Sequence, residues 1–221
     1  MSELSTPLVL EVTTRTLSVC GTSLAVSLLL GLPIGIWLGR RRFRGRVLGV
    51  SLVNAGMGAP PVVVGLLVSM LLWRSGPLAA LDLMYSPAAM VIAQIVIALP
   101  LVVGITLAAV GALDEDWELQ VRTLGIPPPQ RVWLLVREIR LGVLAAVIAA
   151  LGGILSEVGA VSAVGGNLEG ETRVLTTAVL MYTQMGEFGL ALSMAAVLLG
   201  MTLVLAGLLT VVQQGGQGGR S

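Results

Sequence analysis

Five long apolar segments, from which charge is almost excluded, constrain this chain more than any other feature. They cover residues 17–39, 47–73, 88–113, 141–165 and 188–212, and Glu157 is the one charged side chain inside them. About 20 helical residues cross a hydrocarbon core of about 30 Å. A charged side chain at the centre of such a segment costs about 2.5–3.5 kcal/mol of insertion free energy. The pattern therefore predicts an all-α polytopic membrane protein with five membrane-spanning helices in a single domain, residues 1–221.

Two further segments bear on the number of crossings and on the chain end. Residues 174–185 are apolar but number only twelve, which is too few to span a membrane. They predict a short or re-entrant helix on the outer side, and a sixth crossing is the alternative. Residues 213–221 contain four glycines and predict a disordered tail.

The composition excludes several chemistries. All 13 basic residues are Arg, and the chain has no Lys, no His and a single Cys, Cys20. A phosphate-binding P-loop requires Lys, and Ser-His-Asp catalysis and His/Cys zinc sites require His. We therefore expect no enzyme, no metal site and no cofactor bound by this chain. A net charge of +1 offers no field that would attract nucleic acid.

The distribution of Arg predicts the orientation. A run of five Arg lies within residues 40–46, directly after the first apolar segment. Positive charge marks cytoplasmic loops, so the N-terminus is expected outside and the C-terminus, after five crossings, in the cytoplasm. The inner segments then hold ten Arg, and the outer ones hold only Arg15, Arg74 and Arg173. The run is expected to fix topology and to meet anionic lipid head groups.

The one long charged loop, residues 114–140, predicts two helices. The first is expected over residues 114–125, capped by Asp114 and ended by Gly125 and the prolines that begin at Pro127. The second begins near Pro129 and leads directly into the fourth apolar segment.

The first of these helices has two expected faces. Trp117, Val121 and Leu124 share one face, and Glu118 and Arg122 form an i, i+4 pair on the other. One interpretation is an interfacial helix lying flat on the membrane. The other is a docking surface for a soluble partner, formed by a helix–Gly–helix with acidic and aromatic residues.

Glu157 is a functional candidate because ionisable groups inside spans are costly. A carboxylate would repel an anion, so we expect a neutral side chain in an interhelical polar lock, with Asn54 and Gln94 as candidate partners. Static packing is the alternative. Prolines within the spans, including Pro60 and Pro61, predict helix kinks.

Several segments resemble a known family. Arg122-Thr123-Leu124-Gly125, between the third and fourth spans, resembles the core of the EAA loop of ABC importer permeases. Leu119-Gln120-Val121 stands where that family has Glu-Ala-Ala, and Glu118 lies one place early. Five other segments are similar to the tungstate and molybdate permeases: residues 54–66, 74–78, 156–161, 165–167 and 172–178.

The resemblance implies a fold, partners and a function. The fold would be the MetI-like permease core, in the inner (cytoplasmic) membrane of the cell, working as a homodimer. Two ATP-binding cassette subunits would use ATP and magnesium, and an extracytoplasmic binding protein would deliver tungstate or a closely related oxyanion such as molybdate.

The resemblance also suggests roles for individual residues. The loop of residues 114–140 would be the cytoplasmic coupling loop, contacting the ATPase through Trp117, Glu118, Val121, Arg122, Thr123, Leu124, Gly125 and Pro127. The candidate translocation path and gate comprise Asn54, Pro60, Pro61, Gln94, Glu157 and Gly159.

Other functions stay open on sequence alone. An ion-coupled carrier or channel would use Glu157 as a relay and would transport without an ATPase. A structural subunit would only anchor a partner. A membrane enzyme is a further alternative, but this chain lacks the His, Lys or paired intramembrane carboxylates that acid–base catalysis needs.

Overall fold

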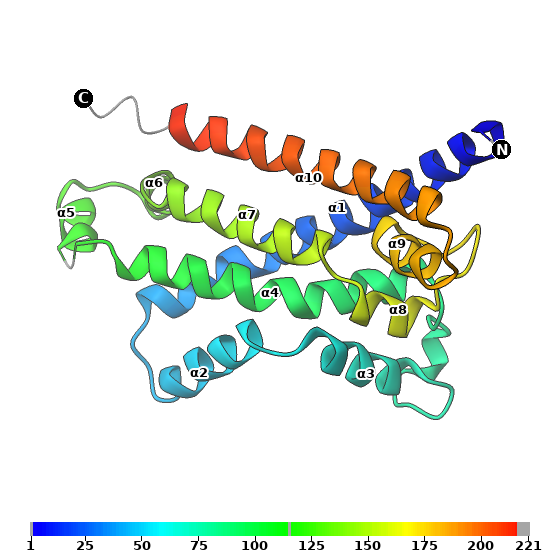
Figure 1. Ribbon diagram of the computed structural model, residues 1–221. Helices are drawn as coiled ribbons and strands as arrows, with labels where there is room; N and C mark the ends of the chain where they lie inside the picture. The colour runs from blue at the N-terminus through cyan, green and yellow to red at the C-terminus, as the bar shows by residue number, and fades with distance from the viewer. Residues whose placement is uncertain (1, 115, 216–221) are drawn as a thin grey trace.

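The computed structural model describes residues 2–114 and 116–215, and within them all regular structure is helical. Side chains are described except those at positions 2–6, 118 and 215. The elements, drawn in Figure 1, are α1 (Ser2–Arg40), α2 (Arg46–Met57), α3 (Pro61–Leu72), a 3-10 turn (Ala79–Leu81), α4 (Pro87–Gly111), α5 (Trp117–Thr123), α6 (Pro128–Glu138), α7 (Arg140–Leu155), α8 (Gly159–Gly165), α9 (Leu175–Gln184) and α10 (Phe188–Gly215). The all-α prediction is confirmed.

The membrane crossings agree with the predicted number only if broken helices are counted as spans. Among the described residues, three helices are long and apolar enough to cross: Pro7–Arg40 within α1, Pro87–Gly111, and Phe188–Gln214 within α10. The number reaches five if each of two bent helix pairs, α2 with α3 and α6 with α7, makes one span.

The second apolar segment is not the continuous helix expected over residues 47–73. It divides into α2 and α3, which are bent by 106°. Pro60 has extended backbone and precedes Pro61 at the first position of α3. Because Pro61 has no backbone N–H and disfavours helical backbone in the residue before it, the helix cannot continue through this point. The predicted kink at Pro60 and Pro61 is thus a full break.

The fourth apolar segment, residues 141–165, is also divided. Its first part, α7, ends at Leu155, and α8 begins at Gly159. At the other end, α6 does not lead straight into α7, because the two are bent by 64° around Ile139. The predicted span therefore corresponds to α7 together with the short helix α8.

The two remaining predictions concern residues 174–185 and the chain end. A ten-residue helix, α9, confirms the short helix expected in the first of these. At the chain end α10 continues through Gly215, beyond the expected start of the tail at residue 213. Residues 216–221 lie outside the described residues, so the tail there stays a prediction.

The bundle has two distinct ends (Figure 1). The first, which we call the Arg40 end, holds the C-terminus of α1 together with α5 and α6. The second, the Arg173 end, holds α8, α9 and the start of α1. Two hydrogen bonds join α1 to the segment between α8 and α9 at this end: the Arg15 guanidinium donates to the carbonyl oxygens of Gly170 at 2.7 Å and Arg173 at 3.4 Å.

Helix α4 is the centre of the bundle, since it packs against α1, α2, α3, α7 and α8. Its closest neighbour, α1, presents glycine at every fourth position: Gly31, Gly35 and Gly39. A Cβ added at Gly35 would lie 2.7 Å from Cβ of Thr106 and 2.8 Å from the carbonyl oxygen of Val103. Helices in lipid associate through such close packing, since lipid tails are as apolar as the helix surfaces.

We predict that Gly35→Ala lowers the free energy of unfolding by about 1–3 kcal/mol, the usual cost of overpacking. The matched control is Gly21→Ala in the same helix, because a Cβ there meets nothing within 4 Å. Removing glycine from an open helical site is neutral or stabilises by up to about 1 kcal/mol. Thermal unfolding in detergent measures both, and equal stability of the two variants would contradict the close α1–α4 contact.

Candidate functional site

The segment of residues 114–140 forms two helices at the Arg40 end, as predicted. Trp117, the first residue of α5, is half-buried and packs against the cluster of Val110, Leu135 and Ile139. Val121, one turn later, is buried. This cluster joins α5 to the end of α4, to α6 and to the start of α7. A displacement of α5 would therefore press directly on the central helix and on α7.

For Leu124, the third residue of the expected apolar face of α5, the prediction is wrong. Leu124 is 75% exposed, because α5 ends at Thr123 and Leu124 follows it as the C-cap. Arg122 and Thr123 are exposed too. Asp114 does not cap the first turn, since its carboxylate accepts from the backbone N–H of Asp116 at 3.0 Å. The side chain of Glu118 lies outside the described residues, so its pairing with Arg122 stays a prediction.

The turn between α5 and α6 depends on Gly125. This residue has φ +67°, in the left-handed region, and an added Cβ would meet nothing within 4 Å. Glycine is thus required here by backbone conformation rather than by space. Pro127 precedes α6 with extended backbone, and Arg131 Nε donates to the carbonyl oxygen of Ile126 at 2.5 Å. The turn therefore presents a defined, solvent-exposed shape.

A second group of predicted residues meets where the two broken spans face each other. Helix α3, which begins at Pro61, packs against α8, which begins at Gly159. A Cβ added at Gly159 would lie 2.6 Å from Cγ2 of Val62. The structure thus brings together Pro60, Pro61, Glu157 and Gly159, of which both prolines are exposed.

Glu157 does not form the predicted lock with Asn54 or Gln94. Its side chain is 6% exposed, and Oε1 accepts a hydrogen bond from the backbone N–H of Ala160 at 2.7 Å. Its carbonyl oxygen accepts from the hydroxyl of Thr176 at 3.0 Å. The carboxylate therefore serves the first turn of α8, whose N–H groups have no helical partner. This use of Glu157 gives no support to an ion relay.

The two expected partners lie elsewhere. Gln94 is buried between α4 and α1, where its Oε1 accepts from the Ser23 hydroxyl at 2.8 Å and its Nε2 lies 3.7 Å from Cys20 Sγ. Asn54 is an exposed residue of α2. Neither joins the α3–α8 contact, so the candidate path residues fall into separate places.

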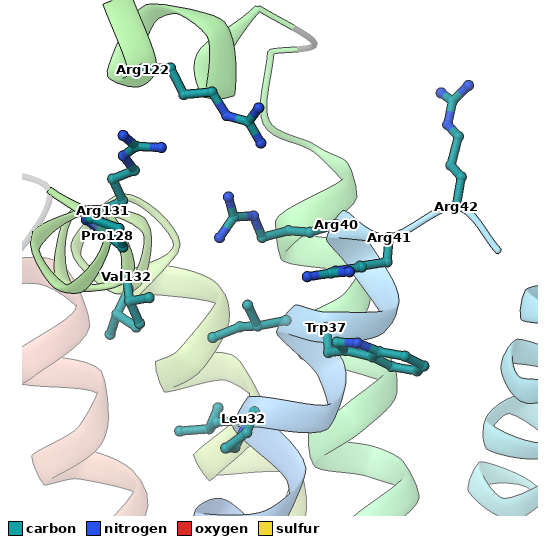
Figure 2. A pocket seen from close by; sticks show the side chains of 12 residues that line it. Leu32, Trp37, Arg40, Arg41, Arg42, Arg122, Pro128, Arg131 and Val132 are labelled. Atoms are coloured by element: carbon teal, nitrogen blue, oxygen red, sulfur yellow. The ribbon is translucent and has the colours of Figure 1, made fainter. Parts of the chain in front are cut away.

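Two threonines and a groove were not expected from the sequence. Thr16 accepts from the N–H of Leu175 at 2.9 Å, and Thr176 holds Glu157 as described. Together they tie α9 to α1 and to the α7–α8 junction. A threonine in an apolar helix carries no sequence signal for such a partner. The groove, of about 900 Å³ at the Arg40 end, is lined in part by Arg40, Arg41 and Arg42 (Figure 2), which the sequence indicated only as a charge run.

Comparison with known proteins gives consistent matches. The profile of the family described as "Binding-protein-dependent transport system inner membrane component" matches residues 31–215. A "Probable anion ABC transporter permease protein" of Haloferax volcanii is 36% identical over 208 residues, covering 92% of this chain and 90% of that protein. The "Tungstate uptake system permease protein TupB" of Peptoclostridium acidaminophilum is 34% identical over 196 residues, covering 89% and 86%. The "Molybdenum transport system permease protein ModB" of Haemophilus influenzae is 28% identical over 176 residues, covering 76% and 77%.

We predict that Glu157→Ala lowers the free energy of unfolding by about 0.5–2 kcal/mol, the usual value of a lost helix cap. Glu157→Gln keeps an acceptor oxygen for the N–H of Ala160 and should lose clearly less, while retaining most transport. Glu171→Ala, which removes an exposed carboxylate near the same end, is the control. If the Gln variant were as unstable as the Ala variant, the negative charge rather than the accepted hydrogen bond would be essential.

Proposed function

Because the chain belongs to the family of binding-protein-dependent transport system inner membrane components, we propose that it is the permease subunit through which an ATP-driven importer moves tungstate or molybdate into the cell. It is a transport subunit of an oxyanion ABC importer and not an enzyme. ATP and magnesium would be used by a partner ATPase, in keeping with a chain that has no Lys for a P-loop.

The observation that carries the proposal is the projecting α5–Gly125–α6 turn. Its outer residues, Thr123 and Leu124, are exposed, while Trp117 and Val121 anchor it to the bundle. A soluble ATPase that seats on the exposed residues would move the anchored ones with them. The motion would pass through the cluster around Leu135 to α4 and α7.

The path from this turn to the translocation region is short and continuous. Helix α7 leads from the Trp117 cluster to Glu157, which caps α8, and α8 packs on α3. A shift of α7 would therefore alter the contact between the two broken spans. A second copy of the chain would complete the path, because such permeases would enclose the substrate between two copies. The exposed apolar face of α3, which includes Val62 and Leu66, suits lipid or that second copy.

The chosen substrate rests on chemistry and on the relatives. The candidate path residues include no Lys, Arg or His, so strong anion binding would belong to an extracytoplasmic binding protein rather than to the permease. The relatives named for tungstate and molybdate support these oxyanions over cations or neutral solutes.

The orientation follows from the charge distribution. With the Arg40 end in the cytoplasm, the α5–α6 turn would meet the ATPase, and the Arg173 end would meet the binding protein. The N-terminus would then lie outside and the C-terminus inside, in the cell membrane.

The substrate is tested by reconstituting the permease with its ATPase and binding protein in proteoliposomes. We expect tungstate or molybdate to stimulate ATP hydrolysis and uptake, and sulfate to do so less. Negligible and equal stimulation by all three anions would contradict an oxyanion importer. Flux through the chain alone, without an ATPase, would instead favour the ion-coupled carrier.

We predict that Gly125→Val lowers substrate-stimulated ATP hydrolysis about ten-fold. Left-handed backbone costs a residue with a side chain about 1–2 kcal/mol, and about 1.4 kcal/mol is a factor of ten in an equilibrium. Gly125→Asn is the matched control, because Asn tolerates this backbone region, and it should retain activity within about three-fold. Equal activity of the Val and Asn variants would show that the turn does not transmit the motion of the ATPase.

A further inference from the structure

Helix α2 has three sides, and one of them packs on the bundle. Toward α4, a Cβ added at Gly56 would lie 2.7 Å from Cγ of Pro100, and one added at Gly104 would lie 3.4 Å from Cγ1 of Val53. In Figure 1, α2 and α3 lie along the side of α4 that is away from α10. No residue of α2 is fully buried, so its other two sides are open in the described part of the chain.

The two open sides differ in chemistry. Leu48 and Leu52, which are 66% and 65% exposed, share one side, as residues four apart do on a helix. The other side carries Ser51 and Asn54, both exposed, and then the exposed C-cap residue Gly58. Spacings of three and four place these three residues in one row, which we call the Asn54 row. The leucine side suits lipid, whereas the Asn54 row does not.

The Asn54 side chain has no partner that would allow it to face lipid. Within residues 2–114 and 116–215, no group forms a hydrogen bond with its amide or with the Ser51 hydroxyl. An unpaired amide is costly in hydrocarbon, where nothing can hydrogen-bond to it. Polar residues of membrane spans therefore face the interior of a bundle or a water-filled cavity.

The broken backbone next to Asn54 has the same requirement. The break lies near the middle of the bent pair of α2 and α3, and so at membrane depth. There the carbonyl oxygens of Met57, Gly58 and Ala59 accept no hydrogen bond from the described residues. Non-helical backbone inside a membrane is tolerated only where protein buries it or where it lines water. An unpaired side chain and an unpaired backbone segment thus both indicate water beside the end of α2.

We propose that the Asn54 row forms one wall of a water-filled translocation path, and that the Asn54 amide donates to the oxyanion as it passes. This inference rests on the proposed function and supplies a contact for its substrate. An Asn amide offers N–H donors without charge, and such a site binds an anion weakly enough to release it. Gln94 and Glu157 are engaged with Ser23 and Ala160, so of these three polar residues Asn54 is the one left to meet a substrate.

Water access is tested with single cysteines in the full chain, reconstituted in proteoliposomes. Cys20, which is buried, is replaced by Ala, and Asn54→Cys or Leu52→Cys is added. Leu52 is the matched control, because it is exposed on the same helix but lies about 200° of helical turn from Asn54. A negatively charged methanethiosulfonate reagent, supplied on both sides of the membrane, measures the rate of labelling.

We expect Asn54→Cys to react at least about ten-fold faster than Leu52→Cys, because the thiolate is the reactive form and it does not arise in hydrocarbon. Tungstate should slow the labelling of Asn54→Cys only. Equal rates for the two cysteines would mean that the two sides of α2 do not differ, and would overturn the wall.

Substrate contact is tested by uptake into proteoliposomes that also contain the ATPase and the binding protein. Asn54→Asp keeps the size of the side chain but adds a charge that repels a dianion, so tungstate uptake should fall at least about ten-fold. Asn54→Gln keeps the donors and should lose no more than about three-fold. Undiminished uptake by a folded Asn54→Asp protein would show that Asn54 does not face the anion.

Labelling examines the same position in protein that has already folded. The reagent leaves a sulfonate at Asn54→Cys, which should block tungstate uptake, whereas labelled Leu52→Cys should import as before. Equal uptake by the two labelled proteins would overturn the inference.

The two measurements separate this inference from the proposed function. If the unmodified chain with its partners imports no oxyanion, the proposed function fails, and fast labelling of Asn54→Cys would still place water at the Asn54 row. If the unmodified chain imports tungstate but Asn54→Cys reacts as slowly as Leu52→Cys, the inference alone fails.

Discussion

The close contact between α1 and α4 is the interaction on which the rest of the structure depends. In lipid there is no gain from hiding one apolar helix against another, so association relies on close packing. Gly31, Gly35 and Gly39 allow that approach along the second half of α1. The same contact sets Arg40 beside the end of α4, where the α5–α6 segment begins. The position of the groove and of the exposed turn thus depends on these three glycines, which have no side chain to hold α1 away from α4.

The two broken spans are a second, related constraint. A break inside a membrane exposes backbone groups that water cannot reach, and each must find a partner within the protein. At the break after α7, the Glu157 carboxylate accepts from Ala160, and Thr176 donates to the Glu157 carbonyl. The single charged residue of the apolar segments therefore stands where a helix must start again. The hydrogen bond that Glu157 accepts from Ala160 stabilises the start of α8, and the same position places Glu157 beside the α3–α8 contact.

Much of this architecture could be predicted from the sequence, and the failures have physical reasons. Hydropathy identified the apolar segments and the short helix α9, because both depend on the length of apolar runs. It could not show the break at residues 156–158, since a broken helix can be as apolar as a continuous one. Nor could it assign partners: Glu157 bonds three residues ahead, and Gln94 meets Ser23, a residue too weakly polar to stand out. Leu124 does not share the buried face of Trp117 and Val121, because α5 ends one residue before it.

The Arg run shows how one set of residues can satisfy two requirements of different precision. Orienting a membrane protein requires only a number of positive charges in a loop, so any position along residues 40–46 would serve. Lining a groove requires particular positions: Arg40 continues the stripe of Leu32 and Ile36 at helical spacing, whereas Arg44 lies in the loop beyond α1. A count of charges cannot distinguish these residues. Their distinction arises only when α1, held on α4 by its glycines, brings its last turn opposite Val132 and Arg131 of α6.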